Sequence, residues 1–267
     1  MSSKGLRFFG TDFNSNNFSP TITSSSASTT KQFALDNIVG TRWISNGEGT
    51  DGNGISFEVD YASNRTIDSL YVYNSNIDDI TLAYWNGASY TTITTSNATI
   101  TKSADGYYLF IKLNSSVSTQ KVRITGDNTI VANQEKYITL FMAFLEIGQY
   151  EYFPTFSPEI RSEQNVFKLT DGRSFVIERG EQFRARIGLR SHVNQNDITL
   201  TETLLERKEP FFIWANGGDD SLFTYSFRPY RFRDIVKVTV VGSHSPSFTN
   251  NYYKSGFNTQ FSIEEVV

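Results

Sequence analysis

The stretch Phe33-Ala-Leu-Asp-Asn-Ile-Val-Gly-Thr-Arg-Trp-Ile-Ser45 carries the strongest fold signal in the N-terminal half of the chain. Its apolar start leads into Asp36-Asn37, whose short side chains hydrogen-bond their own main chain and favour turns. The segment then reaches a large aromatic side chain, Trp43, and strand-like sequence follows. We therefore predict that Trp43 anchors the core of a β-domain.

Strand patterns continue at short intervals after this stretch. Residues 55–61 alternate apolar and polar side chains, which is the period of a strand with one face in water. Asn86-Gly87 is a strong hairpin signal, whereas the apolar run 137–147 is long enough for a strand buried on both faces. We predict a sandwich of about eight strands, including 55–61, 70–73, 80–84, 90–93, 107–113, 121–124 and 137–147.

Composition agrees with a β-rich protein. Of 267 residues, 15% are aromatic, with 22 Phe and 14 Tyr against 2 Met, and flat aromatic side chains suit pleated surfaces. The net charge of −4 gives no general attraction to nucleic acid or to an anionic membrane. No apolar run approaches the length of a membrane span, and the N-terminus lacks a signal-peptide pattern. We expect no nucleic-acid partner, no membrane insertion, and assembly in a cytoplasm.

The N-terminal half resembles the discoidin-like, or galactose-binding-like, domains of the coagulation factor type C group. Their pattern is an alanine, aspartate, threonine, tryptophan and serine at set spacing, followed by an acidic strand and an apolar strand. The matching residues here are Ala34, Asp36, Thr41, Trp43, Ser45, Val59-Asp60, Thr66-Ile67 and Leu70-Tyr-Val72. The resemblance implies a jelly-roll β-sandwich over residues 32–150.

The same resemblance implies a structural calcium ion held by Asp36, Thr41 and Glu146, because calcium prefers carboxylate, hydroxyl and carbonyl oxygens. The alternative is that Asp36 caps a turn and Glu146 is simply exposed. The family's sugar-binding residues lie on variable loops, and no clear set is evident here. The loop 46–53 is rich in Gly and acidic residues, and is either a binding loop or a flexible one. We expect no other cofactor.

Residues 1–31 pass from a short apolar patch into Ser/Thr/Asn-rich sequence, which we predict to be an N-terminal arm or loop. A boundary is predicted near residue 150, because Pro154 and Pro158 interrupt regular structure there. The smaller second domain, 151–267, is predicted to be β-rich α+β with one helix near 196–208. Asn196 or Asp197 is expected to cap this helix, and Pro210 to follow its end.

The second domain resembles small β-rich domains of bacteriophage tail and baseplate proteins. The pattern is a helix, then Pro210-Phe-Phe-Ile-Trp214, a Gly/Asp turn, and the basic-aromatic stretch Phe227 to Asp234. A row of arginines alternates with apolar residues on 183–190. Because arginine and aromatic residues are enriched at interfaces, we predict subunit contacts through Arg184, Arg186, Arg190, Arg228, Tyr230, Arg231 and Arg233. A solvated strand face is the alternative.

Catalysis is not expected. The chain has no cysteine and two histidines, His192 and His244, so nucleophilic triads and most transition-metal sites lack components. The pairs Asp78-Asp79 and Asp219-Asp220 stand beside turn signals, and we interpret them as turn residues.

Two functions are consistent with these patterns. The first is a structural component of a phage tail, baseplate or related injection particle, located in the virion, that assembles with itself and with other tail proteins and also contacts host glycans. The alternative is a carbohydrate-binding module without catalytic activity. The host, the number of subunits and the identity of any glycan stay open.

Overall fold

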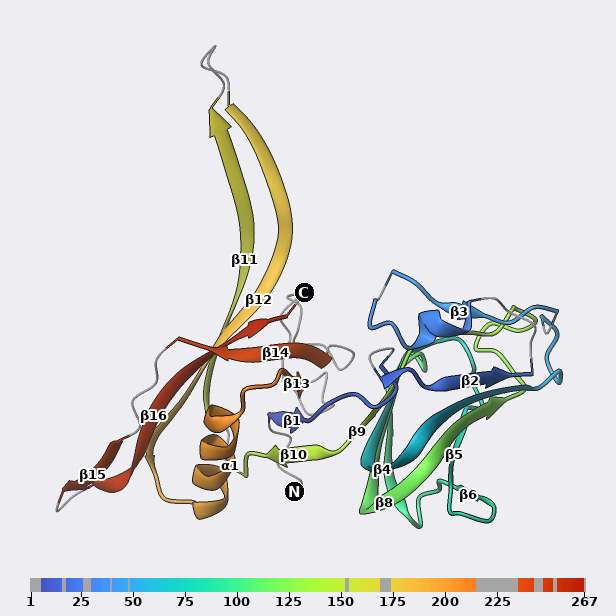
Figure 1. The fold of residues 1–267 in the computed structure, drawn as a ribbon, viewed down its shortest axis with the longest axis horizontal. Coiled ribbons are helices and arrows are strands. Elements are labelled where there is room, and N and C mark those ends of the chain that lie inside the picture. The colour runs from blue at the N-terminus through green and yellow to red at the C-terminus, as the bar shows by residue number, and fades with distance from the viewer. Residues whose placement is uncertain are drawn as a thin grey trace. The chain divides into compact units, whose positions relative to one another are not determined.

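The computed structural model describes residues 6–15, 18–25, 30–38, 40–47, 49–151, 154–168, 174–214, 235–242, 247–251 and 254–266. The chain divides into two compact units (Figure 1). The sandwich unit is Phe9–Glu146, and the second unit combines Met1–Phe8 with Ile147–Val267. Both are built mainly from antiparallel strands, as the sequence predicts. No helix among the described residues is long and apolar enough to cross a membrane.

The sandwich unit forms one hydrogen-bonded sheet that folds into two layers. Its strand order is β3-β9-β4-β8-β5-β6, with β2 added beside β4 and β7 beside β8. The elements are β2 (Thr21–Ser24), the 3-10 helix η2 (Lys31–Ala34), β3 (Trp43–Ile44), β4 (Ile55–Ser75), β5 (Thr81–Trp85), β6 (Tyr90–Thr92), β7 (Ala98–Lys102), β8 (Leu109–Gly126) and β9 (Tyr137–Phe144).

The two long strands, β4 and β8, take part in both layers. One end of β4 pairs with β2 and with 121–126 of β8, and the other end pairs with β9 and with 109–112 of β8. Register shifts between residues 60 and 69 of β4 mark the transition, since bulges bend a strand. The predicted strands 55–61 and 70–73 are therefore one strand, and so are 107–113 and 121–124. The jelly-roll sandwich itself is confirmed.

The sandwich core is apolar and contains Trp43. The Trp43 side chain is fully buried, and its ring centroid lies 5.2 Å from that of Phe57. Core residues from both layers belong to one cluster, for example Phe57 and Val59 from one layer with Leu70 and Val72 from the other. Trp43 is thus the core residue that the sequence predicts.

In its described residues, the second unit has a sheet with one helix packed on it. The sheet order is β10-β1-β13-β14-β16-β12-β11, with β15 beside β16. Its elements are β1 (Arg7–Phe9), β10 (Glu146–Gln149), β11 (Thr155–Lys168), β12 (Ser174–His192), α1 (Gln195–Glu206), β13 (Phe211–Trp214), β14 (Ile235–Val241), β15 (Ser247–Asn251) and β16 (Lys254–Glu265). Residues 160–168 of β11 and 174–183 of β12 pair with each other and extend as a two-stranded ribbon (Figure 1).

Helix α1 packs through Ile198, Leu200 and Leu204 against the sheet of the second unit. The predicted cap at Asn196 or Asp197 is wrong: Asn194 is the N-cap, and its Oδ1 accepts a hydrogen bond from Asp197 N at 3.0 Å. Asp197 is instead fully buried, and its Oδ1 accepts from Glu151 N at 2.8 Å. Asn194 thus caps a helix, Gln195–Glu206, that overlaps the predicted range 196–208.

The prediction of an arm or loop over residues 1–31 differs from the structure. Leu6, Phe8 and Phe9 are fully buried. Leu6 and Phe8 belong to the core of the second unit, whereas Phe9, the next residue, packs in the sandwich unit. Phe8 lies 5.4 Å from Tyr150 in the second unit, and Phe9 lies 5.2 Å from Phe144 in the sandwich unit. Strand β2 then extends the sandwich sheet.

Candidate functional site

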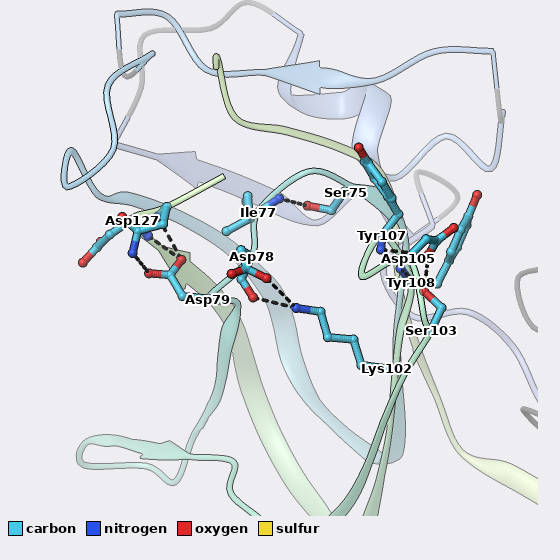
Figure 2. Close-up of polar contacts among 11 residues, drawn as sticks. Ser75, Ile77, Asp78, Asp79, Lys102, Ser103, Asp105, Tyr107, Tyr108 and Asp127 are labelled. Atoms are coloured by element: carbon cyan, nitrogen blue, oxygen red, sulfur yellow. Dashed lines mark hydrogen bonds and ion pairs between the residues drawn. The ribbon is translucent and has the colours of Figure 1, made fainter. Parts of the chain in front are cut away.

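Four loops of the sandwich unit contact one another or the strand ends beside them at one end of its strands, and Figure 2 shows residues of three of these loops. They are the β3–β4 loop (45–54), the β4–β5 loop (76–80), the β7–β8 loop (103–108) and the β8–β9 loop (127–136). A Cβ atom at Gly106 would lie 3.3 Å from Ile130 and 3.4 Å from Lys102 Cε. A Cβ atom at Gly54 would lie only 2.3 Å from Asp127 Oδ1, so the loops are in close contact.

The β7–β8 loop is a tight turn that presents Tyr107. Asp105 Oδ1 accepts hydrogen bonds from Ser103 Oγ at 2.6 Å and from Tyr107 N at 3.2 Å. Gly106 has a φ of 80°, a backbone conformation that residues other than glycine rarely adopt. Ser75 N donates to Tyr107 O at 2.9 Å, which ties the turn to the end of β4. Hydrogen bonds to the main-chain N and to the main-chain O of Tyr107 therefore hold this residue in place.

The β4–β5 loop presents Asp78 and fixes Asp79. Asp79 Oδ1 accepts hydrogen bonds from the main-chain nitrogens of Asp127 and Asn128 at 2.8 and 3.0 Å. Lys102 Nζ donates to Asp78 O at 2.8 Å and Asp78 Oδ1 at 3.0 Å (Figure 2). The two acids lie in a turn, as predicted, but Asp78 also holds an exposed lysine beside the Ser103–Tyr108 turn.

Tyrosine rings at the same end of the strands pack against an arginine and against each other. The Arg42 guanidinium carbon is 4.6 Å from the ring centroid of Tyr137, and Tyr73 packs edge-on against Tyr108 at 5.2 Å. Burial, followed by the Tyr107 hydroxyl, raises the pKa of Tyr137. Both rings are half-buried.

We call these residues the loop site: Arg42, Asp78, Lys102, Asp105, Tyr107 and Tyr137. Half-buried aromatic rings offer flat apolar surface, and the exposed carboxylates and ammonium group offer charge-assisted hydrogen bonds. Of the four loops, the sequence indicated 46–53 as a candidate binding loop and Asp78-Asp79 as turn residues, but it indicated no site on the β4–β5, β7–β8 or β8–β9 loop. The dipeptide Asp105-Gly106 followed by two tyrosines was the turn signal that would have indicated the site.

A second charged cluster lies on the outward face of β4, β6 and β8. Glu58 accepts hydrogen bonds from Tyr90 Oη and from Arg123 Nη2, the latter at 2.6 Å. Lys121 Nζ is 2.8 Å from Asp60 Oδ2 and 3.4 Å from Glu58 Oε1. Burial, followed by the bond to Glu58, raises the pKa of Tyr90 to about 12. The charges of this cluster are paired with one another, so we interpret it as a structural contact between strands.

The structure brings together two of the three residues expected to hold calcium. Thr41 Oγ1 donates to Asp36 Oδ2 at 2.7 Å, and Ile38 N donates to Asp36 Oδ1 at 2.8 Å, which is the turn-capping geometry of the alternative interpretation. Glu146 Oε2 lies 2.6 Å from Lys112 Nζ, so an ammonium group stands where a cation would bind it. Within the described ranges, no group of three His, Cys, Asp or Glu side chains is arranged to hold a metal ion. The calcium site stays a prediction.

The residues predicted to form subunit contacts are only partly described. Arg228, Tyr230, Arg231 and Arg233 lie outside the described residues. On β12, Arg186 and Arg190 are exposed while Phe183, Ala185, Ile187 and Leu189 are buried, which is the predicted alternation. Arg184 is half-buried and stands between two glutamates, Glu159 and Glu264, in the strand register. Whether these arginines contact another subunit stays a prediction.

The sandwich unit is a jelly-roll β-sandwich, and the chain is similar to solved structures of this fold. A chitosan-binding module of a Paenibacillus chitosanase/glucanase shares 21% identity, with a TM-score of 0.41, over 51% of this chain and 99% of its own. A family 32 carbohydrate-binding module of Clostridium perfringens NanJ, solved with galactose, shares 16% identity, with a TM-score of 0.39, over 47% of this chain and 93% of its own. These values give no basis for transferring a ligand to this chain. No protein-family model matches the sequence, and no curated protein matches it.

Proposed function

We propose that the sandwich unit is a non-catalytic carbohydrate-binding module, and that its ligand binds at the loop site. The observation that carries the proposal is that the loops at one end of the strands present half-buried Tyr107 and Tyr137 together with exposed Asp78, Lys102 and Asp105. A sugar ring has an apolar C–H face and a rim of hydroxyl groups. An aromatic ring can cover the first, and charged side chains can bind the second.

The loops that form the loop site are held in place by hydrogen bonds within the protein. Asp105 fixes the turn that carries Tyr107, and Asp79 fixes the β8–β9 loop through main-chain nitrogens. Because ordering loops on binding lowers affinity, a preformed site loses less free energy on association. The resemblance of the sequence to the discoidin-like domains supports the same reading, since that resemblance implies sugar recognition on loops.

A glycan array probed with the full-length protein tests the proposal, followed by calorimetry with each glycan that gives a signal. Tyr107→Ala and Lys102→Ala should each weaken binding by about tenfold or more, which corresponds to roughly 1.4 kcal/mol. Lys121→Ala is the matched control, because Lys121 is also paired with an aspartate and is similarly exposed, but belongs to the other cluster. The proposal fails if the wild-type protein binds no glycan, or if the control weakens binding as much as Lys102→Ala.

Assembly into a particle is the second candidate function, and the β11–β12 ribbon favours it. Residues 174–183 of β12 pair with β11, whereas β16 begins its pairing at Arg184. Unpaired strand edges are templates for pairing with another chain, and a two-stranded ribbon alone is marginally stable in water. A phage tail or injection-particle component that contacts itself, other tail proteins and host glycans would use both units.

Sedimentation of the purified full-length protein tests this second candidate. Wild-type protein should form a discrete oligomer at high concentration, and Arg186→Glu with Arg190→Glu should reduce it, because like charges would then oppose each other in a contact. A protein that sediments as a monomer at every concentration would leave the carbohydrate-binding module as the function.

A further inference from the structure

We propose that Lys136 is a positioning residue for the loop site, whose buried ammonium group acts as an internal cation between the β3–β4 loop and the start of β9. The inference rests on the proposed function for its consequence in binding. Its structural part, that this charge holds two loops together, stands on contacts within the sandwich unit.

Lys136 is buried to an extent that is rare for lysine. Its relative exposure is 0%, although it lies in a loop region whose neighbours, residues 131–135, are all exposed. The Nζ atom donates to Thr50 O at 3.3 Å. The main chain of Lys136 is also bound to the β3–β4 loop, since its N donates to Ser45 Oγ at 2.9 Å and its O accepts from Ser45 N at 2.8 Å. Both parts of the residue therefore hold the same loop.

A buried ammonium group requires polar partners and a compensating charge. Asp51, one residue after Thr50, supplies a nearby carboxylate. Desolvation acts to raise the pKa of Asp51, but hydrogen bonds from Thr129 and the main chain of Asn133, together with the charge of Lys136, bring that pKa below its ordinary value. Thr129 N and Oγ1 donate to Asp51 Oδ1 at 3.1 and 3.0 Å. The Lys136 charge is thus part of a contact that includes the β8–β9 loop.

The contact extends to the tyrosines through the residues on either side of Lys136. Asn76 Nδ2 donates to Glu135 O at 2.9 Å, and Asn76 Oδ1 accepts from Tyr137 N at 2.8 Å. Ser75 Oγ donates to Tyr137 O at 2.8 Å. The main chain of residues 135–137 is therefore fixed by Asn76 and Ser75 on one side and by the β3–β4 loop on the other. A displacement of Lys136 would move the ring of Tyr137.

The Lys136 ammonium group takes the place that a bound cation could have between the β3–β4 and β8–β9 loops. Carbonyl and carboxylate oxygens from different loops are the groups that a bound calcium ion would hold together. A lysine provides one positive charge and three donors without an ion. The loop junction should accordingly depend on the charge at position 136.

Amide hydrogen exchange of the full-length protein, read by NMR or mass spectrometry, tests the structural part. Lys136→Met keeps the length of the side chain but removes its charge, and Lys136→Arg keeps the charge. We expect exchange at Ser45, Gly52 and Tyr137 to become about tenfold faster or more in Lys136→Met. Lys136→Arg should restore much of the protection, and Lys121→Met should leave these amides unchanged. Wild-type protection in Lys136→Met would overturn the proposal.

The binding part uses as its probe the glycan that gives the strongest signal on the array, with the wild-type protein and the variants at a temperature where circular dichroism shows all of them folded. Lys136→Met should weaken binding about tenfold, and Lys136→Arg should recover it. Faster exchange without any change in affinity would show a structural role only, and would overturn the positioning role. Lys136→Gln replaces Lys136→Met if the latter does not fold, because glutamine keeps a hydrogen-bond donor without the charge. Lys136→Gln should show the same faster amide exchange. Wild-type exchange in Lys136→Gln would overturn the role of the charge. Absence of binding by the wild type would count against the proposed function, whereas the exchange experiment would still decide the role of Lys136.

Discussion

Replacement of Trp43 by alanine is the most direct test of how the sandwich is held together. Trp43 is fully buried against Phe57, and loss of a buried tryptophan to alanine costs about 3–5 kcal/mol of unfolding free energy. Trp43 Nε1, however, has no hydrogen-bond partner among the described residues. A buried donor without a partner costs about 1–3 kcal/mol, and the substitution removes it together with the ring. We therefore expect a loss of about 3 kcal/mol, at the lower end of the range.

Trp43→Phe is the matched variant, because it keeps a ring in the core and removes the unpaired N–H. The two effects oppose each other, so the unfolding free energy should stay within about 1 kcal/mol of wild type. Urea unfolding of the fragment 9–146, followed by circular dichroism, measures both values. A loss below about 1 kcal/mol in Trp43→Ala would refute the role of Trp43 as core anchor. A Trp43→Phe variant as unstable as Trp43→Ala would refute the argument from the unpaired donor.

Other predictions concern fragment bounds, pH and metal. The fragment 9–146 should be more stable to urea than 32–148, because the shorter one lacks β2 and leaves the buried partners of Asn14 unsatisfied; equal stability would contradict this. The pKa of Tyr90 is raised from about 10 in the unfolded chain to about 12 in the folded protein. The stability that the protonated Tyr90 hydroxyl contributes is therefore fully present below pH 10 and is lost as the pH rises towards 12. The difference in stability between wild type and Tyr90→Phe should shrink over that range, and a constant difference would contradict it. If calcium binds at Asp36, a chelator should lower the melting temperature of wild type and not of Asp36→Asn, whereas no effect on either would remove the site.

Local signals in the sequence were sufficient for the elements that depend on near neighbours. Asn86-Gly87 predicted the hairpin of β5 and β6, and Gly87 has the positive φ, 100°, that such turns require. The alternation over 183–190 predicted which side chains of β12 are buried. The helix near 196–208 was also found, since its period and the following proline are local features.

Features that depend on distant parts of the chain could not be predicted in this way. Asn14 stands in polar sequence, yet it is fully buried because Nδ2 binds Phe141 O and Oδ1 accepts from Tyr61 Oη. Lys136 follows a polar, exposed segment of sequence, and its burial depends on the distant β3–β4 loop that covers it. The loop site escaped for the same reason, because its tyrosines and charges come from loops that meet only after the strands have paired.

The hydrogen bonds between β1 and β10 show that the sandwich unit is an insertion in the chain of the second unit. Tyr150 N donates to Leu6 O, and Gly10 N donates to Leu145 O at 2.9 Å, so the two strands run past each other as the arms of a hairpin. The sandwich unit, Phe9–Glu146, is the part of the chain that connects these two strands. A domain inserted at such a point has its two ends side by side, and can be gained or removed without breaking the host sheet. Joining Phe8 to Ile147 through a short turn should therefore yield the second unit as a protein in its own right.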